Sequence, residues 1–579
     1  MKRLLCVFLT LTLILALPAH VFATDGALPS GIAPERLGKE IETFVAEHED
    51  TTAGMAVAVF DRNDILYRNY FGFADLSAGL TVNEDTVFEW GSVTKLLVWV
   101  SVMQLWEQGC IDLEADIQTY LPDGFLANLT YDAPVTMLHL MNHNAGFEDS
   151  IVGMLTTDTR NIVSLEAYLT DVQPRQVFAP GEITAYSNWG VTLAGYIVER
   201  ISGMPFYLYV QERIFEPLGM EHSALNTDLS DNPWVQTRRE ALECYTAEGV
   251  LIPGCVNYFN CYPAGMCTST LNDLTAFASA LLNRESSLFS DPATHDALMT
   301  PTAWFPGTET AMNCHGLWAL ESYGTAVLGH GGNTTGCSSN LLLDMEHGIG
   351  MVVMTNQSGE QVYNQEMPAL VFGQCRHEPL NFTGFVATAR TVFRGPLKLY
   401  RLMGTAYVEP EDLEGVLAVH HGSRLTVPHG LDYLTVSLPE LAIDYGFLIL
   451  WAAALLFSLV SLLTMAIAGL IRKLRRRPRI LPLRRWAVVS CTVTWLPLLP
   501  AVPAVLSLLA NDQWLRWQYQ AVFGLFLLFA AVYGLLMGVG LWKQWKRRKF
   551  DWFHIAVVLA LGICLANICY WETGLFWLM

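Results

Sequence analysis

The chain has 579 residues, of which 52% are hydrophobic and only 15% are charged, and this composition excludes an intrinsically disordered protein. The charge is unevenly distributed. Fourteen of the 34 Lys and Arg but only three of the 55 Asp and Glu follow position 445, so residues 1–445 carry a formal charge of −32. Because nucleic acid repels so acidic a body, we expect no nucleic-acid partner.

The first 23 residues have the pattern of a secretory signal peptide. Lys2 and Arg3 precede a mostly apolar run from Leu4 to Leu17, and small residues follow up to Ala23. This run is too short to span a bilayer comfortably, which favours a cleaved leader over the alternative of an uncleaved anchor. We therefore expect residues 1–23 to direct export of the domain that follows, residues 24–375.

Within residues 24–375, β-type runs at Ala53–Phe60 and Ile65–Phe73 predict a hairpin. The long apolar segment Val93–Trp106 predicts a buried helix. The region of about 110–290 mixes helical periodicity with Pro- and Gly-rich loops, and three short β-type runs then follow at 326–330, 339–343 and 350–355. Strands at both ends with helices between them predict an α/β fold: one sheet, covered by helices, with a helical insertion.

Residues 376–445 have an irregular pattern and are interpreted as a juxtamembrane connector. Residues 446–579 then predict an all-α transmembrane bundle, because each of four apolar segments is long enough to span a bilayer. These segments are 446–471, 486–510, 518–542 and 553–571.

Two loops between these segments are strongly basic. Loop 472–485 has eight Lys and Arg, and loop 543–549 has five. The positive-inside rule places both in the cytoplasm, so the large N-terminal domain is expected outside a cell membrane that the chain crosses several times. The lipid bilayer is therefore one expected partner.

Eight cysteines lie in the part expected to be exported, and an even number there permits disulfides. We expect Cys314 and Cys337 to form one pair, because both flank a glycine-rich segment. The spacing of Cys255, Cys261 and Cys267 matches no usual zinc pattern, so no metal site is predicted.

Ser92 and Lys95 form the first candidate catalytic pair. They are three residues apart on the predicted helix, so the hydroxyl and the amine lie on one face. Lys95 is the only charged residue from Ser92 to Trp106. A buried amine has a lowered pKa and can accept the proton of a serine hydroxyl. The alternative is a lysine that reaches solvent at the start of the helix.

The segment Tyr186-Ser187-Asn188 is the second candidate. Side chains two apart project to one side of an extended segment, so Tyr186 and Asn188 could both line a cleft. A surface turn with a packed tyrosine is the alternative, because Tyr67-Arg68-Asn69 and Tyr258-Phe259-Asn260 have the same pattern.

The segment Gly329-His330-Gly331-Gly332-Asn333 is the third candidate. Glycines at the end of a strand allow a substrate backbone to approach closely, and His330 would point into the same cleft. The alternative is a glycine-rich turn with an ordinary histidine.

In this order and spacing, the three segments resemble the active-site elements of the penicillin-recognising serine hydrolases, above all class C β-lactamases, D,D-peptidases and related esterases. The resemblance covers about residues 37–360. It includes further family-type phrases, namely Phe88-Glu89-Trp90-Gly91, Thr136–Gly146 (with Ala145 where the family has serine), Pro180-Gly181, Glu216–Met220 and Pro263–Met266.

The resemblance implies a β-lactamase-like antiparallel sheet flanked by helices. It implies that Ser92 is the nucleophile that becomes acylated, that Lys95 is its base and that Tyr186 shares the proton transfer. No cofactor is implied.

The resemblance also implies the substrate-binding groups. Asn188 would hydrogen-bond the substrate, and the backbone N–H groups of Ser92 and Asn333 would form the oxyanion hole. His330-Gly331-Gly332 stands where many relatives have Lys-Thr-Gly. Histidine is mostly neutral near pH 7, which weakens the case for efficient β-lactam hydrolysis.

The sequence thus predicts a membrane-anchored extracytoplasmic serine hydrolase that cleaves an amide, peptide or ester bond of a small-molecule or peptide substrate. The alternative is an extracytoplasmic sensor, acylated or liganded, that signals through the helices, because one span is enough for tethering.

Overall fold

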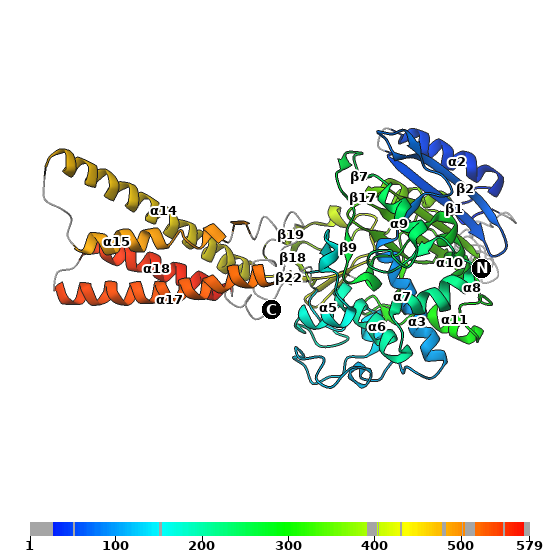
Figure 1. Cartoon of the computed structure of the whole chain (residues 1–579), viewed down its shortest axis with the longest axis horizontal. Helices are drawn as coiled ribbons and strands as arrows, with labels where there is room; N and C mark the ends of the chain where they lie inside the picture. Colours follow the sequence, from blue (N-terminus) through cyan, green and yellow to red (C-terminus); the bar gives the residue numbers. More distant parts are fainter. Residues whose placement is uncertain are drawn as a thin grey trace, which may run out of the picture.

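The computed structural model describes residues 27–49, 52–149, 153–390, 404–428, 431–476, 482–500, 516–547 and 551–571, together with 402, 502 and 503. The expected leader, residues 1–23, lies outside this set. Figure 1 shows a large body, which contains α2 to α11, and an elongated group of helices at the C-terminal end. Strands β18, β19 and β22 lie between the two parts.

A nine-stranded antiparallel sheet forms the centre of the body. Its strand order is β11-β12-β13-β14-β15-β16-β1-β2-β3, so strands from both ends of the domain meet where β1 pairs with β16. The predicted α/β fold with one sheet is therefore confirmed. The strands are β1 (Gly54–Asp61), β2 (Ile65–Asp75), β3 (Leu80–Thr81), β11 (Ala303–Trp304), β12 (Ala311–Cys314), β13 (Leu317–Leu320), β14 (Val327–Asn333), β15 (Ser338–Asp344) and β16 (Ile349–Thr355).

Both faces of this sheet are covered, because alternate residues of β1 enter two different cores. Ala56, Ala58 and Phe60 belong to the larger core, which also contains residues of α3 (Lys95–Glu107), α6 (Asn188–Ser202) and α10 (Leu271–Leu282). Met55, Val57 and Val59 face the other core with α2 (Pro34–Glu47). This accounts for a strand that is apolar throughout.

The segment interpreted as an irregular connector contains a second sheet. Its five antiparallel strands are β18 (Gly384–Thr388), β19 (Thr405–Val408), β20 (Val419–His421), β21 (Arg424–Val427) and β22 (Leu431–Val436), in the order β19-β18-β22-β21-β20. We call these five strands, with the described residues that lie between them in the chain, the β-module. The interpretation as irregular was wrong, because short strands with few buried positions give a weak alternation signal.

After the β-module, the described ranges contain the helices α14 (Leu438–Leu474), α15 (Pro482–Val493), α17 (Arg516–Arg547) and α18 (Trp552–Tyr570). Among the described residues, three helical segments are long and apolar enough to cross a membrane, namely Leu438–Leu474, Gly524–Lys546 and Trp552–Tyr570. The expected span 486–510 does not form one described helix. Helix α15 has only 12 residues, a turn follows at 494–497, and part of the rest lies outside the described residues.

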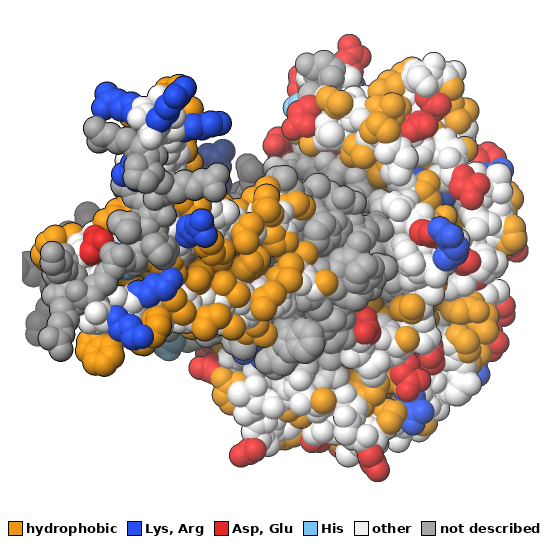
Figure 2. Space-filling view, turned by 60° about the vertical axis from the view of Figure 1, so that its left-hand side comes forward, with side chains coloured by type: hydrophobic (Ala, Val, Ile, Leu, Met, Phe, Trp, Pro, Cys, Tyr) orange, Lys and Arg blue, Asp and Glu red, His pale blue; other side chains and the backbone are white. Residues whose placement is uncertain are grey.

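Apart from Arg516, the first residue of α17, the described part of the helical region has its basic residues at the end far from the body. In Figure 2, Lys and Arg gather there, an apolar band follows, and acidic side chains are scattered over the body. Helix α14 ends in this basic region with Arg472 and Lys473, and α17 ends there with Lys546 and Arg547.

The cysteine pair expected at Cys314–Cys337 does not form; both thiols are buried and free. Cys314 ends β12 whereas Cys337 precedes β15, so two strands, β13 and β14, separate them in the sheet. Adjacent strands are about 4.8 Å apart, which puts the two backbones beyond the reach of a disulfide. The thiol of Cys337 instead interacts with that of Cys244.

Candidate active site

Ser92 lies in a tight 3₁₀ turn, η1 (Gly91–Thr94), between strand β4 (Val87–Glu89) and helix α3. Two hydrogen bonds hold Trp90, the residue just before the turn, in place. The backbone N–H of Trp90 donates to the carbonyl of Cys267 at 2.7 Å, and its indole N–H donates to Ser269 Oγ at 2.7 Å. Gly91 has φ = +51°, and a Cβ there would lie 2.6 Å from the backbone nitrogen of Asn333. Only glycine therefore allows the turn to pack this closely on β14.

Lys95 begins α3, and its amine reaches back to the serine. Lys95 Nζ donates to Ser92 Oγ at 2.9 Å and to the carbonyl oxygen of Ala264 at 2.6 Å. The side chain is completely buried, and this burial lowers the pKa of Lys95 to about 7. The alternative of a lysine that reaches solvent is wrong. A neutral amine at this distance can accept the hydroxyl proton.

Tyr186 approaches the same oxygen from another side. Its hydroxyl donates to Ser92 Oγ at 2.8 Å, and Lys95 Nζ lies 4.9 Å from the centre of its ring. Burial raises the pKa of Tyr186, so the phenol stays protonated near neutral pH. Of the two groups on the serine oxygen, Lys95 is therefore suited to be the base and Tyr186 to be a hydrogen-bond donor.

His143 supports Tyr186, and sequence reasoning gave it no role. Its ring stacks on that of Tyr186 with 4.3 Å between centroids. It also receives backbone hydrogen bonds from both neighbours of Tyr186: Ala185 N donates to its carbonyl at 2.8 Å, and Ser187 N to its Nδ1 at 3.2 Å. Burial holds the pKa of His143 well below the ordinary value, so Nδ1 remains an acceptor. The signal was present in the Thr136–Gly146 phrase.

Strand β14 brings the third predicted segment to the serine. β13 pairs with β14 only over Val327–Gly329, so the segment from His330 to Asn333 has an edge that β13 does not occupy. A Cβ on Gly332 would lie 3.0 Å from Ser92 N, which shows how closely this strand approaches the turn. The backbone of Asn333 lies against Gly91, so the two expected oxyanion donors are on neighbouring segments.

The His330 side chain is near these groups but is not exposed. It is 3% exposed, and its ring centroid lies 6.3 Å from that of Tyr186 and 6.3 Å from that of Trp318. His330 Nδ1 also lies 2.6 Å from the carbonyl oxygen of Gly331. The structure thus brings His330 beside the phenol rather than out into solvent.

Asn188 begins α6 and is held by a carboxylate that sequence reasoning missed. Asp149 accepts a hydrogen bond from the Asn188 backbone N–H at 3.1 Å and from its Nδ2 at 3.3 Å. Asp149 is itself paired with Arg390 of the β-module, with 2.7 Å between Oδ2 and Nη2. No local pattern pointed to either residue, because the two are 241 positions apart.

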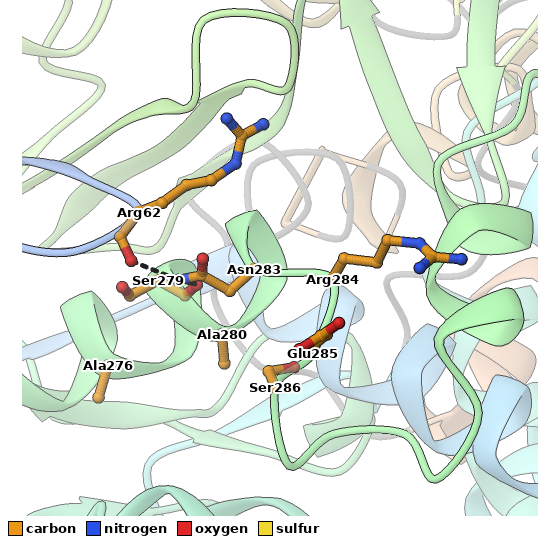
Figure 3. A pocket seen from close by; sticks show the side chains of 8 residues that line it. All are labelled: Arg62, Ala276, Ser279, Ala280, Asn283, Arg284, Glu285 and Ser286. Atoms are coloured by element: carbon orange, nitrogen blue, oxygen red, sulfur yellow. Dashed lines mark hydrogen bonds between the residues drawn. The ribbon is translucent and has the colours of Figure 1, made fainter.

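Figure 3 shows a different hollow, of about 710 Å³, beside α10. It contains none of the predicted catalytic residues and is lined by Arg62, Ala276, Ser279, Ala280, Asn283, Arg284, Glu285 and Ser286. Arg62 donates to the carbonyl of Met345, and Arg284 is paired with Asp296. We therefore assign the candidate site to Ser92 and its neighbours. Among the described residues, no group of three or more His, Cys, Asp or Glu could hold a metal ion.

Comparison with known proteins agrees with this geometry. The β-lactamase family model matches residues 40–375, which is more than half of the chain. The chain belongs to the β-lactamase family. It is 35% identical over 170 residues to a β-lactamase of Yersinia enterocolitica (29% of this chain, 42% of the relative). It is 24% identical over 351 residues to penicillin-binding protein 4* of Bacillus subtilis (58% and 75%).

Other similar proteins differ in activity. A D-aminopeptidase of Gluconobacter oxydans is 26% identical over 331 residues, covering 55% of this chain and 59% of that protein. A D-amino acid amidase of Ochrobactrum anthropi has a similar solved structure, with a TM-score of 0.48 and 23% identity over 58% of this chain and 96% of that chain. The β-lactamase family is one of serine hydrolases that act on amides, peptides and esters, and the proteins similar to this chain include a β-lactamase and a D-aminopeptidase.

Proposed function

We propose that this protein is a membrane-anchored serine hydrolase whose catalytic domain lies outside the cytoplasm and that it cleaves an amide, peptide or ester bond through an acyl-enzyme on Ser92. The observation that carries the proposal is the convergence of two groups on one oxygen. Lys95 Nζ and Tyr186 OH lie 2.9 Å and 2.8 Å from Ser92 Oγ.

The first half of the reaction acylates the serine. Neutral Lys95 takes the proton of Ser92, whose oxygen attacks the substrate carbonyl carbon. Charge develops on the carbonyl oxygen, which the N–H groups of Ser92 and Asn333 would stabilise. When the bond breaks, the leaving amine or alcohol gains a proton. Tyr186 can pass this proton from Lys95, because its hydroxyl lies 2.8 Å from the serine oxygen to which Lys95 Nζ is also hydrogen-bonded.

The second half reverses these roles. Lys95, neutral again, accepts a proton from a water molecule that attacks the acyl carbon, and the proton returns to Ser92 as the acid product leaves. Asn188 and the edge of β14 that β13 does not occupy are the groups that we assign to holding the substrate. Asn188 is partly exposed and starts α6, and the strand edge supplies backbone hydrogen-bonding groups.

The membrane placement rests on separate observations. Three described helices have the length and apolarity of membrane spans, and the basic residues, apart from Arg516, lie at the end far from the catalytic body. The positive-inside rule then puts that end in the cytoplasm and the body outside, as a leader at residues 1–23 would require.

Turnover of a chromogenic ester by the full chain in detergent tests the proposal. We expect steady turnover that is lost in Ser92→Ala. Ser101→Ala is the matched control, because Ser101 lies on α3, the helix that follows the Ser92 turn, and its hydroxyl donates to the carbonyl of Leu97. Equal loss in both variants, or turnover that persists in Ser92→Ala, would overturn the assignment of Ser92.

The sensor alternative keeps one supporting observation. Ala387 and Val436 of the β-module form a core with Leu441 of α14 and Trp571, which follows α18. The helices thus contact the module that reaches the site. A protein that becomes acylated once and does not turn over would favour the sensor.

A further inference from the structure

Arg390 reaches the candidate site from outside the part of the chain that matches the β-lactamase family. It follows strand β18 by two residues, and the family match ends at residue 375. Its guanidinium pairs with Asp149 at 2.7 Å, and its Cζ lies 5.4 Å from the centre of the Tyr186 ring. The β-module therefore contributes a charged side chain to the surroundings of the catalytic groups.

Through Asp149, Arg390 acts on the segment that follows Tyr186. Asp149 has no exposed side-chain surface, and it accepts hydrogen bonds from the backbone N–H groups of Asn188 at 3.1 Å and Trp189 at 3.2 Å. These are the first two residues of α6. A buried carboxylate needs a partner of opposite charge, and removing one partner of such a pair is costly. The ion pair thus fixes the helix start two residues after the phenol.

The β-module also holds the segment that precedes Tyr186. Asp432, on β22, accepts a hydrogen bond from Thr184 N at 2.8 Å, and its own N–H donates to the Thr184 carbonyl at 3.0 Å. Thr426 donates to the other oxygen of this carboxylate, and Arg424 donates to the carbonyl of Glu182 at 2.6 Å. Asp432 is 1% exposed. The two hydrogen bonds between Asp432 and Thr184 are buried and reciprocal, which is typical of a fixed attachment.

We propose that the β-module is a positioning part of the catalytic centre: Asp432 and the Arg390–Asp149 pair hold the two ends of the Tyr186 segment so that the phenol reaches Ser92. Arg390 is then a positioning residue, and the family-type domain 24–375 lacks it. This inference rests on the proposed hydrolase function and adds to it that activity requires the module.

The pair also sets the charge around the catalytic amine. Arg390 and Lys95 Nζ both lie within 5.4 Å of the Tyr186 ring centre, so at most about 10 Å separates them. Asp149 raises the pKa of Lys95 and Arg390 lowers it, so each offsets the other. The titratable and charged groups around Lys95, taken over all elements packed against it, are Ser92, Tyr186, His143, Asp149, Cys261 and Arg390.

Loss of Arg390 alone leaves the Asp149 carboxylate buried without this partner near Lys95. A unit charge about 10 Å away at an effective dielectric constant of about 20 shifts a pKa by on the order of one unit. Since the protonated amine cannot act as the base, the acidic limb of the pH profile should move to higher pH by about that amount. Loss of both charges should leave the limb in place.

The experiment measures kcat, KM and the pH profile of kcat/KM for a chromogenic ester, with the full chain in detergent. Arg390→Gln is expected to lose roughly tenfold to a hundredfold in kcat and to move the acidic limb up by about one pH unit. Arg390→Lys keeps the cation, so its limb should stay while kcat falls by less. Arg376→Gln, an exposed arginine just before the module, is the matched control and should behave as the unsubstituted chain.

The double variant Asp149→Asn/Arg390→Gln replaces Arg390→Gln in the test if that single variant does not fold. The double variant removes both charges of the pair, so neither is left without its partner. It should retain the original limb with a reduced kcat. The inference is overturned if kcat is unchanged in Arg390→Gln, or in the double variant when Arg390→Gln does not fold. It is also overturned if Arg390→Gln and Arg390→Lys lose kcat equally with no movement of the limb. An unsubstituted chain that shows no Ser92-dependent turnover would instead refute the hydrolase function itself.

Discussion

Of two adjacent glycines of β14, Gly332 should tolerate substitution by alanine poorly, whereas Gly331 should tolerate it well. A Cβ on Gly332 would lie 2.7 Å from Ser339 Oγ and 3.0 Å from Ser92 N, and the carbonyl oxygen of Trp90 would be closer still. A Cβ on Gly331 would have no neighbour nearer than 3.9 Å. Gly332→Ala therefore forces β14 away from the Ser92 turn, whereas Gly331→Ala fits.

The expected loss follows from this displacement. Relieving the Gly332 contacts requires a movement on the order of 1 Å between the two segments that we assign to the oxyanion hole, and a misplacement of that size costs roughly a hundredfold in rate. Loss of one oxyanion donor costs about 10²–10³ in kcat. Overpacking of the buried strand should also lower stability by about 1–3 kcal/mol.

The assay is ester turnover together with thermal unfolding of both variants. We expect Gly332→Ala to lose at least about a hundredfold in kcat, whereas Gly331→Ala, which leaves the Ser92 turn in place, should lose much less in kcat even where its methyl group raises KM at the substrate edge. If Gly332→Ala retains nearly full kcat, the close approach of β14 to Ser92 is not what builds the site. Equal loss in the two variants would contradict the reasoning as well.

Three further predictions concern the serine and its support. Because the pKa of Lys95 is lowered to about 7 and its neutral form is the base, kcat/KM should fall as the pH drops below about 7 and level off above it; a flat profile down to pH 5.5 would contradict this. Tyr186→Phe should slow the phosphonylation of Ser92 by a fluorophosphonate about 10²–10⁴-fold, whereas Tyr258→Phe, on a segment of the same pattern, should have no effect. Glu89→Gln leaves Arg239 buried without its 2.7 Å partner and should lower the free energy of unfolding by about 3–5 kcal/mol in chemical denaturation; a change below about 1 kcal/mol would show that the pair is dispensable.

The sequence predicted those parts of the site that depend on local spacing. Ser92 and Lys95 are one helical turn apart, so their contact follows from helix geometry once the apolar segment is recognised as buried. Tyr186 was different. Two other segments share its pattern, and only the resemblance in order and spacing separated it from them.

The parts that escaped prediction depend on contacts between distant elements. Arg390 and Asp432 contact the Tyr186 segment because the β-module packs against the domain that contains Tyr186. Packing between parts of the chain that are distant in sequence leaves no periodic signal. The β-module itself was missed because its strands have only three to six residues each. The prediction of a Cys314–Cys337 disulfide was wrong for the same reason, because the order of strands in the sheet, and not closeness in the sequence, decides which thiols meet.

The most direct test of the central claim is the mass of the protein after brief exposure to a fluorophosphonate, which phosphonylates an activated serine with release of fluoride, followed by peptide mapping. The account predicts a single adduct, on the peptide that contains Ser92, which is absent in Ser92→Ala and formed more slowly in Tyr186→Phe. An adduct on any other residue, or one that persists in Ser92→Ala, would contradict it.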